Sequence, residues 1–180
     1  LDDIESLTIP DGILEIEYAA FDRYVFERDY HYVKDRNPRC WNHDTMQPGI
    51  QTIVFPDSLK RIEDKAFFNM ICLKNIHFGN SLEHIGKFAF YSCGLEKIEL
   101  PGSIKDIGES AFDNCIYLKS VKMSEGIEVI PEEMFLHCTA LREVILPSTI
   151  KKIGELAFWD CFNLVKIDLP EGLTVIEWGL

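Results

Sequence analysis

The feature that most constrains this chain is a sequence pattern that returns about every 23 residues. Each copy opens with an apolar residue, and successive openers lie 23, 22, 23, 23 and 23 residues apart. The openers are Phe55, Phe78, Leu100, Met123, Leu146 and Leu169. One unit of this size cannot bury an apolar face alone, so such units stack on one another. The sequence therefore predicts a solenoid.

A phenylalanine and a cysteine recur at fixed places inside each unit. The phenylalanine follows the opener by 12 residues, and alanine precedes it except where Met134 stands. Three residues later comes a cysteine, or Met70 in the first regular unit. The two columns are Phe67, Phe90, Phe112, Phe135, Phe158 and Cys93, Cys115, Cys138, Cys161. The short step of 22 arises at Gly94, the single residue between its cysteine and leucine where other units have two.

Alternation of apolar and polar residues predicts strands. Residues 141–146 fit the L-x-x-L-x-L strand signature of leucine-rich repeats, with valine in the middle place. Period-two alternation puts Val144 and Leu146 inward, and Glu143 and Ile145 outward. Prolines after several openers end the strand, because proline cannot continue donating to a ladder.

The rest of each unit returns the chain to the next strand. An I-x-x-I-G step, as at residues 150–154, is a second short apolar segment, and its glycine suggests a tight turn or a positive φ. Residues 155–161 are too short for an independent helix and are expected to form a turn or two of α or 3₁₀ helix. We therefore expect an α/β solenoid over residues 1–180, a right-handed leucine-rich-repeat coil with a parallel sheet of short strands and short α or 3₁₀ turns.

Composition excludes two classes of partner. The formal net charge of −12 argues against nucleic acid, because phosphate binding needs clustered lysine and arginine. No run of about 18 apolar residues occurs, so no membrane insertion is expected.

The row of four cysteines is expected to hold buried free thiols, since a straight row suits neither disulfides nor a tetrahedral zinc ion. Cys40 and Cys72 lie off this row and are the candidates for reactivity.

Residues 33–49 occupy the length of one repeat but lack its core residues. One interpretation is a degenerate repeat that bulges out as a loop, and the other is an inserted loop that carries specificity. As a binding loop it would present Tyr30, Tyr32, Trp41 and His43, with the aromatic rings as a platform for a sugar or peptide. As a metal site it would use His31, Cys40, His43 and Asp44, although one C-x-x-H without a second pair is a weak signal.

Both ends of the array look uncapped, which predicts a piece of a longer protein or end-to-end self-association.

The repeated I-x-x-I-G-x-x-A-F-x-x-C-x-x-L-x-x-I-x-L-P resembles the BspA-like leucine-rich repeats, over nearly the whole chain apart from residues 33–49. The resemblance implies a secreted or surface-attached protein of a bacterium or protozoan, associated with adhesion to host matrix proteins and other cells. It brings no catalytic residues and no cofactor. An extracellular or cell-surface location is what the family resemblance implies.

The outward columns of the predicted strands are the candidate binding face, because they vary while the inward columns repeat. They comprise Thr52, Asn75, Lys97, Ser120, Glu143, Lys166 and Val54, His77, Glu99, Lys122, Ile145, Asp168. A merely solvated face would vary in the same way. The expected function is a non-catalytic interaction or adhesion module for a protein or glycan on a host or neighbouring cell. The alternatives are a structural spacer in a larger surface protein, or a metal-dependent enzyme site in residues 31–44.

Overall fold

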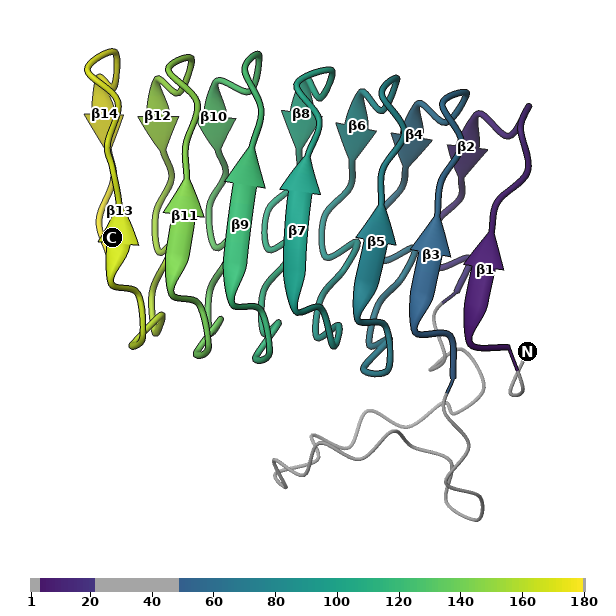
Figure 1. Ribbon diagram of the computed structural model, residues 1–180. Helices are drawn as coiled ribbons and strands as arrows, with labels where there is room; N and C mark the ends of the chain where they lie inside the picture. The colour runs from purple at the N-terminus through teal and green to yellow at the C-terminus, as the bar shows by residue number, and fades with distance from the viewer. Residues whose placement is uncertain (1–3, 22–48, 180) are drawn as a thin grey trace.

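The computed structural model describes residues 4–21 and 49–179, in which the chain winds as a solenoid with two columns of parallel strands (Figure 1). The longer column forms the front face and its members are called front strands. They are β1 (Ser6–Thr8), β3 (Thr52–Val54), β5 (Asn75–His77), β7 (Lys97–Leu100), β9 (Ser120–Met123), β11 (Glu143–Ile145) and β13 (Lys166–Ile167). The return strands are β2 (Glu15–Ile16), β4 (Arg61–Ile62), β6 (His84–Ile85), β8 (Asp106–Ile107), β10 (Val129–Ile130), β12 (Lys152–Ile153) and β14 (Val175–Ile176).

The sequence repeat sets the strand register. Residues one unit apart pair across adjacent front strands, as in Val121 with Val144 and Ile53 with Ile76. Both residues of each pair are buried, whereas Ile145, which follows Val144 on the same strand, is 48% exposed. The parallel solenoid and its inward and outward sides are therefore as predicted.

The predicted helical turns are wrong, because residues 4–21 and 49–179 contain no helix. After each return strand, the chain turns through a segment that we call the corner, residues 155–161 in one unit. Two residues of this corner, Leu156 and Asp160, have positive φ angles of 55° and 62°. A right-handed helix needs a negative φ at every residue, so this backbone cannot be helical. The α/β description therefore does not hold for the described chain.

Corners instead bond to each other from turn to turn, in what we call the corner ladder. Phe90 N–H donates to Ala111 O at 2.8 Å, and Ser92 N–H donates to Asp113 O at 2.9 Å. Alternate N–H groups of one corner thus point at the next corner, as in a parallel sheet. This ladder satisfies backbone groups that a short helix would have left unpaired at its ends.

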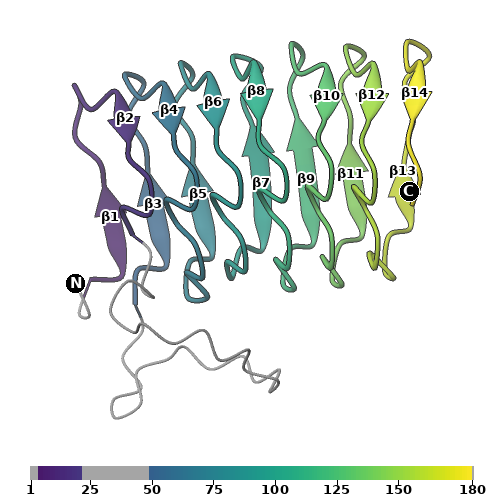
Figure 2. The same ribbon diagram turned by 180° about the vertical axis from the view of Figure 1, so that it is seen from behind.

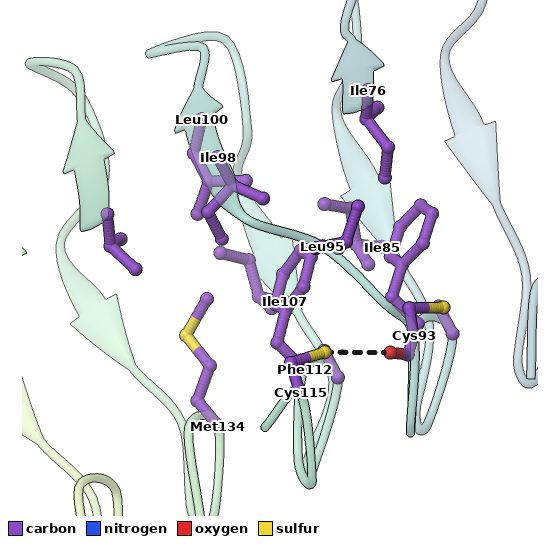
Figure 3. Packing of buried hydrophobic residues seen from close by; sticks show 14 of the residues in the cluster. Ile76, Ile85, Cys93, Leu95, Ile98, Leu100, Ile107, Phe112, Cys115 and Met134 are labelled. Atoms are coloured by element: carbon purple, nitrogen blue, oxygen red, sulfur yellow. Dashed lines mark hydrogen bonds between the residues drawn. The ribbon is translucent and has the colours of Figure 1, made fainter. Parts of the chain in front are cut away.

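The core is a stack of phenylalanine rings beside a row of thiols. Ring centroids of successive phenylalanines lie 5.0–5.9 Å apart from Phe21 to Phe158, and Phe67 through Phe135 are fully buried. Each cysteine of the row donates its S–H to the phenylalanine carbonyl of the preceding turn, as Cys115 does to Phe90 O at 3.3 Å (Figure 3). The four thiols are free and buried, as predicted.

The glycine of the I-x-x-I-G step serves close packing and not a positive φ. Gly154 is absent from the positive-φ residues, but a Cβ placed on it would lie 2.6 Å from Glu132 N in the preceding turn. Gly154 N–H donates to Ile130 O at 2.8 Å. Glycine therefore fits the close approach of these two turns, although the same bond also forms from Glu63 to Ile16 O and from Glu177 to Ile153 O.

The strand columns are each interrupted once. The front strands form two sheets, β1-β3-β5 and β7-β9-β11-β13, and the return strands form β2-β4-β6-β8 and β10-β12-β14. We call the gap between β5 and β7 the front break, and the gap between β8 and β10 the return break. Both pairs are visibly set farther apart than their neighbours, and Figure 2 shows the return break from behind. The front break coincides with the unit that Gly94 shortens.

At the C-terminal end of the described chain, the last turn leaves core positions open. Ile176 is 47% exposed, whereas Ile153, the same residue one turn earlier, is fully buried. End-to-end association through such a surface stays a prediction.

Candidate binding surface

The two predicted columns lie side by side on the front face. Thr52 pairs in register with Asn75, Lys97 with Ser120, and Ser120 with Glu143. Lysine and glutamate side chains of these columns are exposed or half-buried, and their backbones lie in or directly after the front strands. The structure thus gathers the twelve predicted side chains onto one face, with the front break between Asn75 and Lys97.

Ion pairs across neighbouring strands order this face. Lys166 Nζ lies 2.9 Å from Glu143 Oε1, Lys119 Nζ 2.9 Å from Glu96 Oε2, and Lys122 Nζ 3.9 Å from Glu99 Oε2. A hydrogen bond from Lys119 lowers the pKa of Glu96, and a hydrogen bond to Glu143 raises the pKa of Lys166. Exposed pairs of this kind contribute little to stability, because solvent screens them. Their effect is to hold side chains in rows.

A third outward column was missed in the sequence. Its members directly follow the buried leucine of each unit. They include Lys74, Glu96, Lys119 and Arg142, all of which are exposed. The signal was present, because a charged residue directly follows the inward leucine in each of these four units. With this column included, basic residues outnumber acidic ones on the front face, although the chain has 30 Asp and Glu against 18 Lys and Arg.

The front face is shallow. The hollow over β7, β9 and β11 has a volume of about 140 Å³ and lies between Lys97, Lys122, Glu143 and Ile145. Pockets that enclose a small molecule usually hold about 300–1,000 Å³. This hollow is therefore too small to enclose a small molecule.

A charged cluster lies on the corner side, away from the front face. His137 Nδ1 lies 3.1 Å from Asp113 Oδ1, and its Nε2 lies 3.8 Å from Asp160 Oδ2. Beside them, Ser110 Oγ donates to Glu133 Oε2 at 2.7 Å. Burial raises the pKa of Asp113 to about 6, against the opposing effect of His137. Sequence reasoning missed this cluster because its columns change residue type from turn to turn, although Ser110 shares a column with Glu133 and His137 shares one with Asp160.

The predicted loop residues Tyr30, Tyr32, Trp41 and His43 lie outside the described residues, as do His31, Cys40 and Asp44. Within the part of the chain that the structure describes, no group of three or more His, Cys, Asp and Glu is arranged to hold a metal ion. The expectation that Cys72 is a reactive thiol is wrong, because Cys72 is disulfide-bonded. Over residues 4–21 and 49–179, nothing in the fold is a helix that could cross a membrane.

The sequence profile of the BspA type leucine rich repeat region matches in six copies, over residues 46–165 and 124–179. Among curated proteins, no match is found. The family resemblance seen in the repeated motif is therefore confirmed over most of the chain.

Solved structures with this fold are bacterial leucine-rich repeat proteins. A leucine-rich repeat protein from Bacteroides ovatus is 25% identical with a TM-score of 0.56, and the match covers 99% of this chain and 56% of that one. The leucine rich repeat protein of T. pallidum is 25% identical with a TM-score of 0.63, covering 89% and 78%. A leucine rich cell surface protein of Faecalibacterium prausnitzii, 24% identical with a TM-score of 0.55, shares the fold over 98% of this chain and 32% of its own.

Proposed function

This chain belongs to the BspA-type leucine-rich repeat family, and from that premise we propose that it is a non-catalytic binding module whose front face contacts a protein or glycan on another cell. The observation that carries the proposal is the front face itself. Its outward columns change residue type from turn to turn, while the buried columns beneath them repeat. A rigid repeat scaffold with a variable, shallow face suits recognition of extended surfaces.

The charge of the front face supports a partner with exposed acidic groups. Lysines such as Lys97, Lys122 and Lys166 stand out on a chain that is acidic as a whole. Paired charges that are already ordered steer encounter and select against wrong partners more than they add affinity. The partner is therefore expected to bind faster at low salt than at high salt.

We place the module outside the cell or on its surface. The disulfide of Cys72 supports this location, because disulfides persist in oxidising compartments and are rare in the cytosol. Attachment to a host or a neighbouring cell follows from the same proposal and has the same test.

The test is binding of the purified chain to immobilised matrix proteins and glycans. In one variant Lys97, Lys122 and Lys166 are replaced by glutamate, and in a matched control Lys60, Lys105 and Lys151 of the return side are replaced in the same way. Charge reversal on the front face is expected to weaken binding at least about tenfold and slow association, whereas the control keeps its affinity. Equal affinity of both variants would remove the front-face proposal.

Two other functions have their own outcomes in the same experiment. A variant that lacks residues 33–49 tests the binding loop, since loss of binding in that variant alone would move recognition to the loop. A chain that binds no member of the panel in any form would favour a structural spacer.

A further inference from the structure

The return break has a specific cause in the backbone. Between β4 and β6, three hydrogen bonds join the turns: Glu83 N–H and His84 N–H donate to Lys60 O, and Gly86 N–H donates to Ile62 O. The same three bonds join β10 to β12. Between β8 and β10 the corresponding donors would be Glu128, Val129 and residue 131, and none of these bonds forms within the described chain.

Pro131 explains the loss. It occupies the place of Gly86, Gly108 and Gly154, and it has no N–H to donate to Ile107 O. Side-chain bulk alone does not open this column, because Glu63 and Glu177 stand at the same place and their N–H groups donate to Ile16 O and Ile153 O. A proline at this place therefore removes one bond; β10 and β8 do not pair, and the other two donors do not reach Lys105 O.

The two turns on either side of the return break stay joined along their other two columns. On the front, β7 and β9 form a four-residue ladder from Lys97–Ser120 to Leu100–Met123, longer than the other ladders of the described chain. At the corner, Phe112 N–H donates to Met134 O at 3.1 Å, and Asn114 N–H to Leu136 O at 2.8 Å. The ring centroids of Phe112 and Phe135 lie 5.9 Å apart, against 5.1–5.5 Å for the other pairs from Phe67 to Phe158.

One edge of this interface is thus open and the others are held. A hollow of about 160 Å³ lies over the open edge, lined by Ile104, Ile107, Ile127 and Val129. One turn earlier the arrangement is reversed. There the return strands β6 and β8 pair, whereas the front strands β5 and β7 do not, and Glu96 N–H to Lys74 O at 3.2 Å is the backbone bond that spans the front break.

We propose that the return break is a bending joint, at which the turns from β9 onward tilt against the preceding turns about the β7–β9 ladder. Because its bonds are missing on the return side alone, the motion opens and closes that side and leaves the front face continuous. The front break one turn earlier permits tilting in the opposite sense. The solenoid is therefore two stiffer blocks connected through the turn that contains β7 and β8, and this inference does not depend on the proposed function.

Amide hydrogen exchange of the intact chain, resolved by NMR, tests the joint inside one molecule. The amides of Glu128 and Val129 are compared with Lys151 and Lys152 one turn later, and with Glu83 and His84 two turns earlier. Exchange at Glu128 and Val129 is expected to be faster on the order of tenfold or more. Protection equal to that of the other four amides would overturn the proposal.

Pro131→Gly supplies the matched variant, because it installs the residue that other turns have at this place. Its expected effect is to slow exchange at Glu128 and Val129 toward the rates of Lys151 and Lys152. Unchanged exchange in a folded Pro131→Gly protein would show that the proline does not make the joint.

Spin-label distances report the bending itself. Two pairs, each two turns apart on one column, are made with Lys60→Cys plus Lys105→Cys, and with Lys105→Cys plus Lys151→Cys. The second pair spans the return break and is expected to give the broader distance distribution, which Pro131→Gly narrows. Equal widths for the two pairs would overturn the joint even if the amide rates differ.

Discussion

Two successive interfaces of this solenoid differ in the residue that follows the return strand, Pro131 in one and Gly154 in the other. Across Gly154, the turns are held by return strands, front strands and corners together, whereas across Pro131 the return strands are unpaired. Both interfaces keep the phenylalanine stack and the corner ladder. Three columns of contacts, the front strands, the return strands and the corners, join each turn to the next. The array therefore keeps its fold where one of these columns is interrupted.

The difference also shows how a repeat protein acquires local character. Its inward residues are constrained by the turns on both sides, so they recur. Pro131 lies outside those inward columns, at a place where other turns have glycine or glutamate, and it accompanies a change in strand pairing without loss of the fold. Side-chain hydrogen bonds also bridge these two turns. They join His137 to Asp113 and Ser110 to Glu133.

The largest expected effect comes from the column that both interfaces share. Phe112→Ala is expected to destabilise the protein by about 3–5 kcal/mol, because its fully buried ring stacks between Phe90 and Phe135. Phe162→Ala is the control, since Phe162 is 77% exposed and its loss should cost less than about 0.5 kcal/mol. Urea unfolding measures both, and equal costs would mean that the ring stack is not the core.

Glycine and proline can be tested against each other at the place where the interfaces differ. Gly154→Ala is expected to cost about 1–3 kcal/mol, because its Cβ would meet Glu132 N at 2.6 Å and strain the bond to Ile130 O. Pro131→Ala should cost less than about 0.5 kcal/mol, since that interface already accommodates a Cβ. Thermal unfolding of the two variants decides this, and a larger cost for Pro131→Ala would contradict the close contact at Gly154 as the cause of the difference.

The Asp113–His137 pair predicts a pH dependence specific to the Pro131 interface. Burial raises the pKa of Asp113 from 3.8 to about 6, so the folded protein binds this proton more tightly than the unfolded chain does. The contribution of Asp113 to stability is therefore complete below about pH 4 and is lost as pH rises toward 6 and above. Asp113 is faced by His137 and Glu133, and His137 in turn by Asp160.

Asp113→Asn cannot ionise and should escape that loss. Relative to the wild type, the variant is expected to gain on the order of 1–2 kcal/mol in unfolding free energy between pH 4 and pH 7. Denaturant unfolding across this range gives the comparison. Parallel stability curves for the two proteins would show that Asp113 titrates with an ordinary pKa.

The smallest expected effect is on the alkylation rate of the buried thiols, which shows whether the corner ladder opens when the joint bends. Burial raises the pKa of Cys138 well above its usual value and that of Cys161 to about 12, so neither forms a reactive thiolate while the corners stay closed. Alkylation at pH 8 should modify Cys161 first, since it is the most exposed of the row, and Cys93 and Cys138 only as fast as the protein unfolds. Faster labelling of Cys138 than of Cys161 would mean that the joint opens the corner as well.

The sequence predicted those parts of the structure that repeat. The unit length, the inward columns, the free thiols and the twelve outward side chains all follow from spacing, because a residue that recurs every turn has the same neighbours every turn. The helical corners were predicted wrongly, because local length arguments do not include the hydrogen bonds that adjacent corners offer. Pro131 was invisible as a break, since its consequence depends on the hydrogen bond that Gly108 and Gly154 donate to the preceding turn.

The candidate binding face was predictable as a location and not as a specificity. Alternation places Lys122 and Ile145 outward, and the structure adds the cross-strand pairs and the third column. What such a surface recognises depends on the partner, which no intrachain pattern encodes.

The left-handed residues of the corners have a consequence for how the chain folds. Lys65, Phe88, Glu133 and Leu156 all have φ angles of 55–57°, a region that costs a residue with a Cβ roughly 1–2 kcal/mol. An isolated corner would therefore relax to another conformation, and it adopts this one only against a corner that is already formed. The first turn of the array is therefore expected to fold slowly, and each further turn then folds on the surface of the turn already formed. The residue type at the left-handed corner position is free to vary.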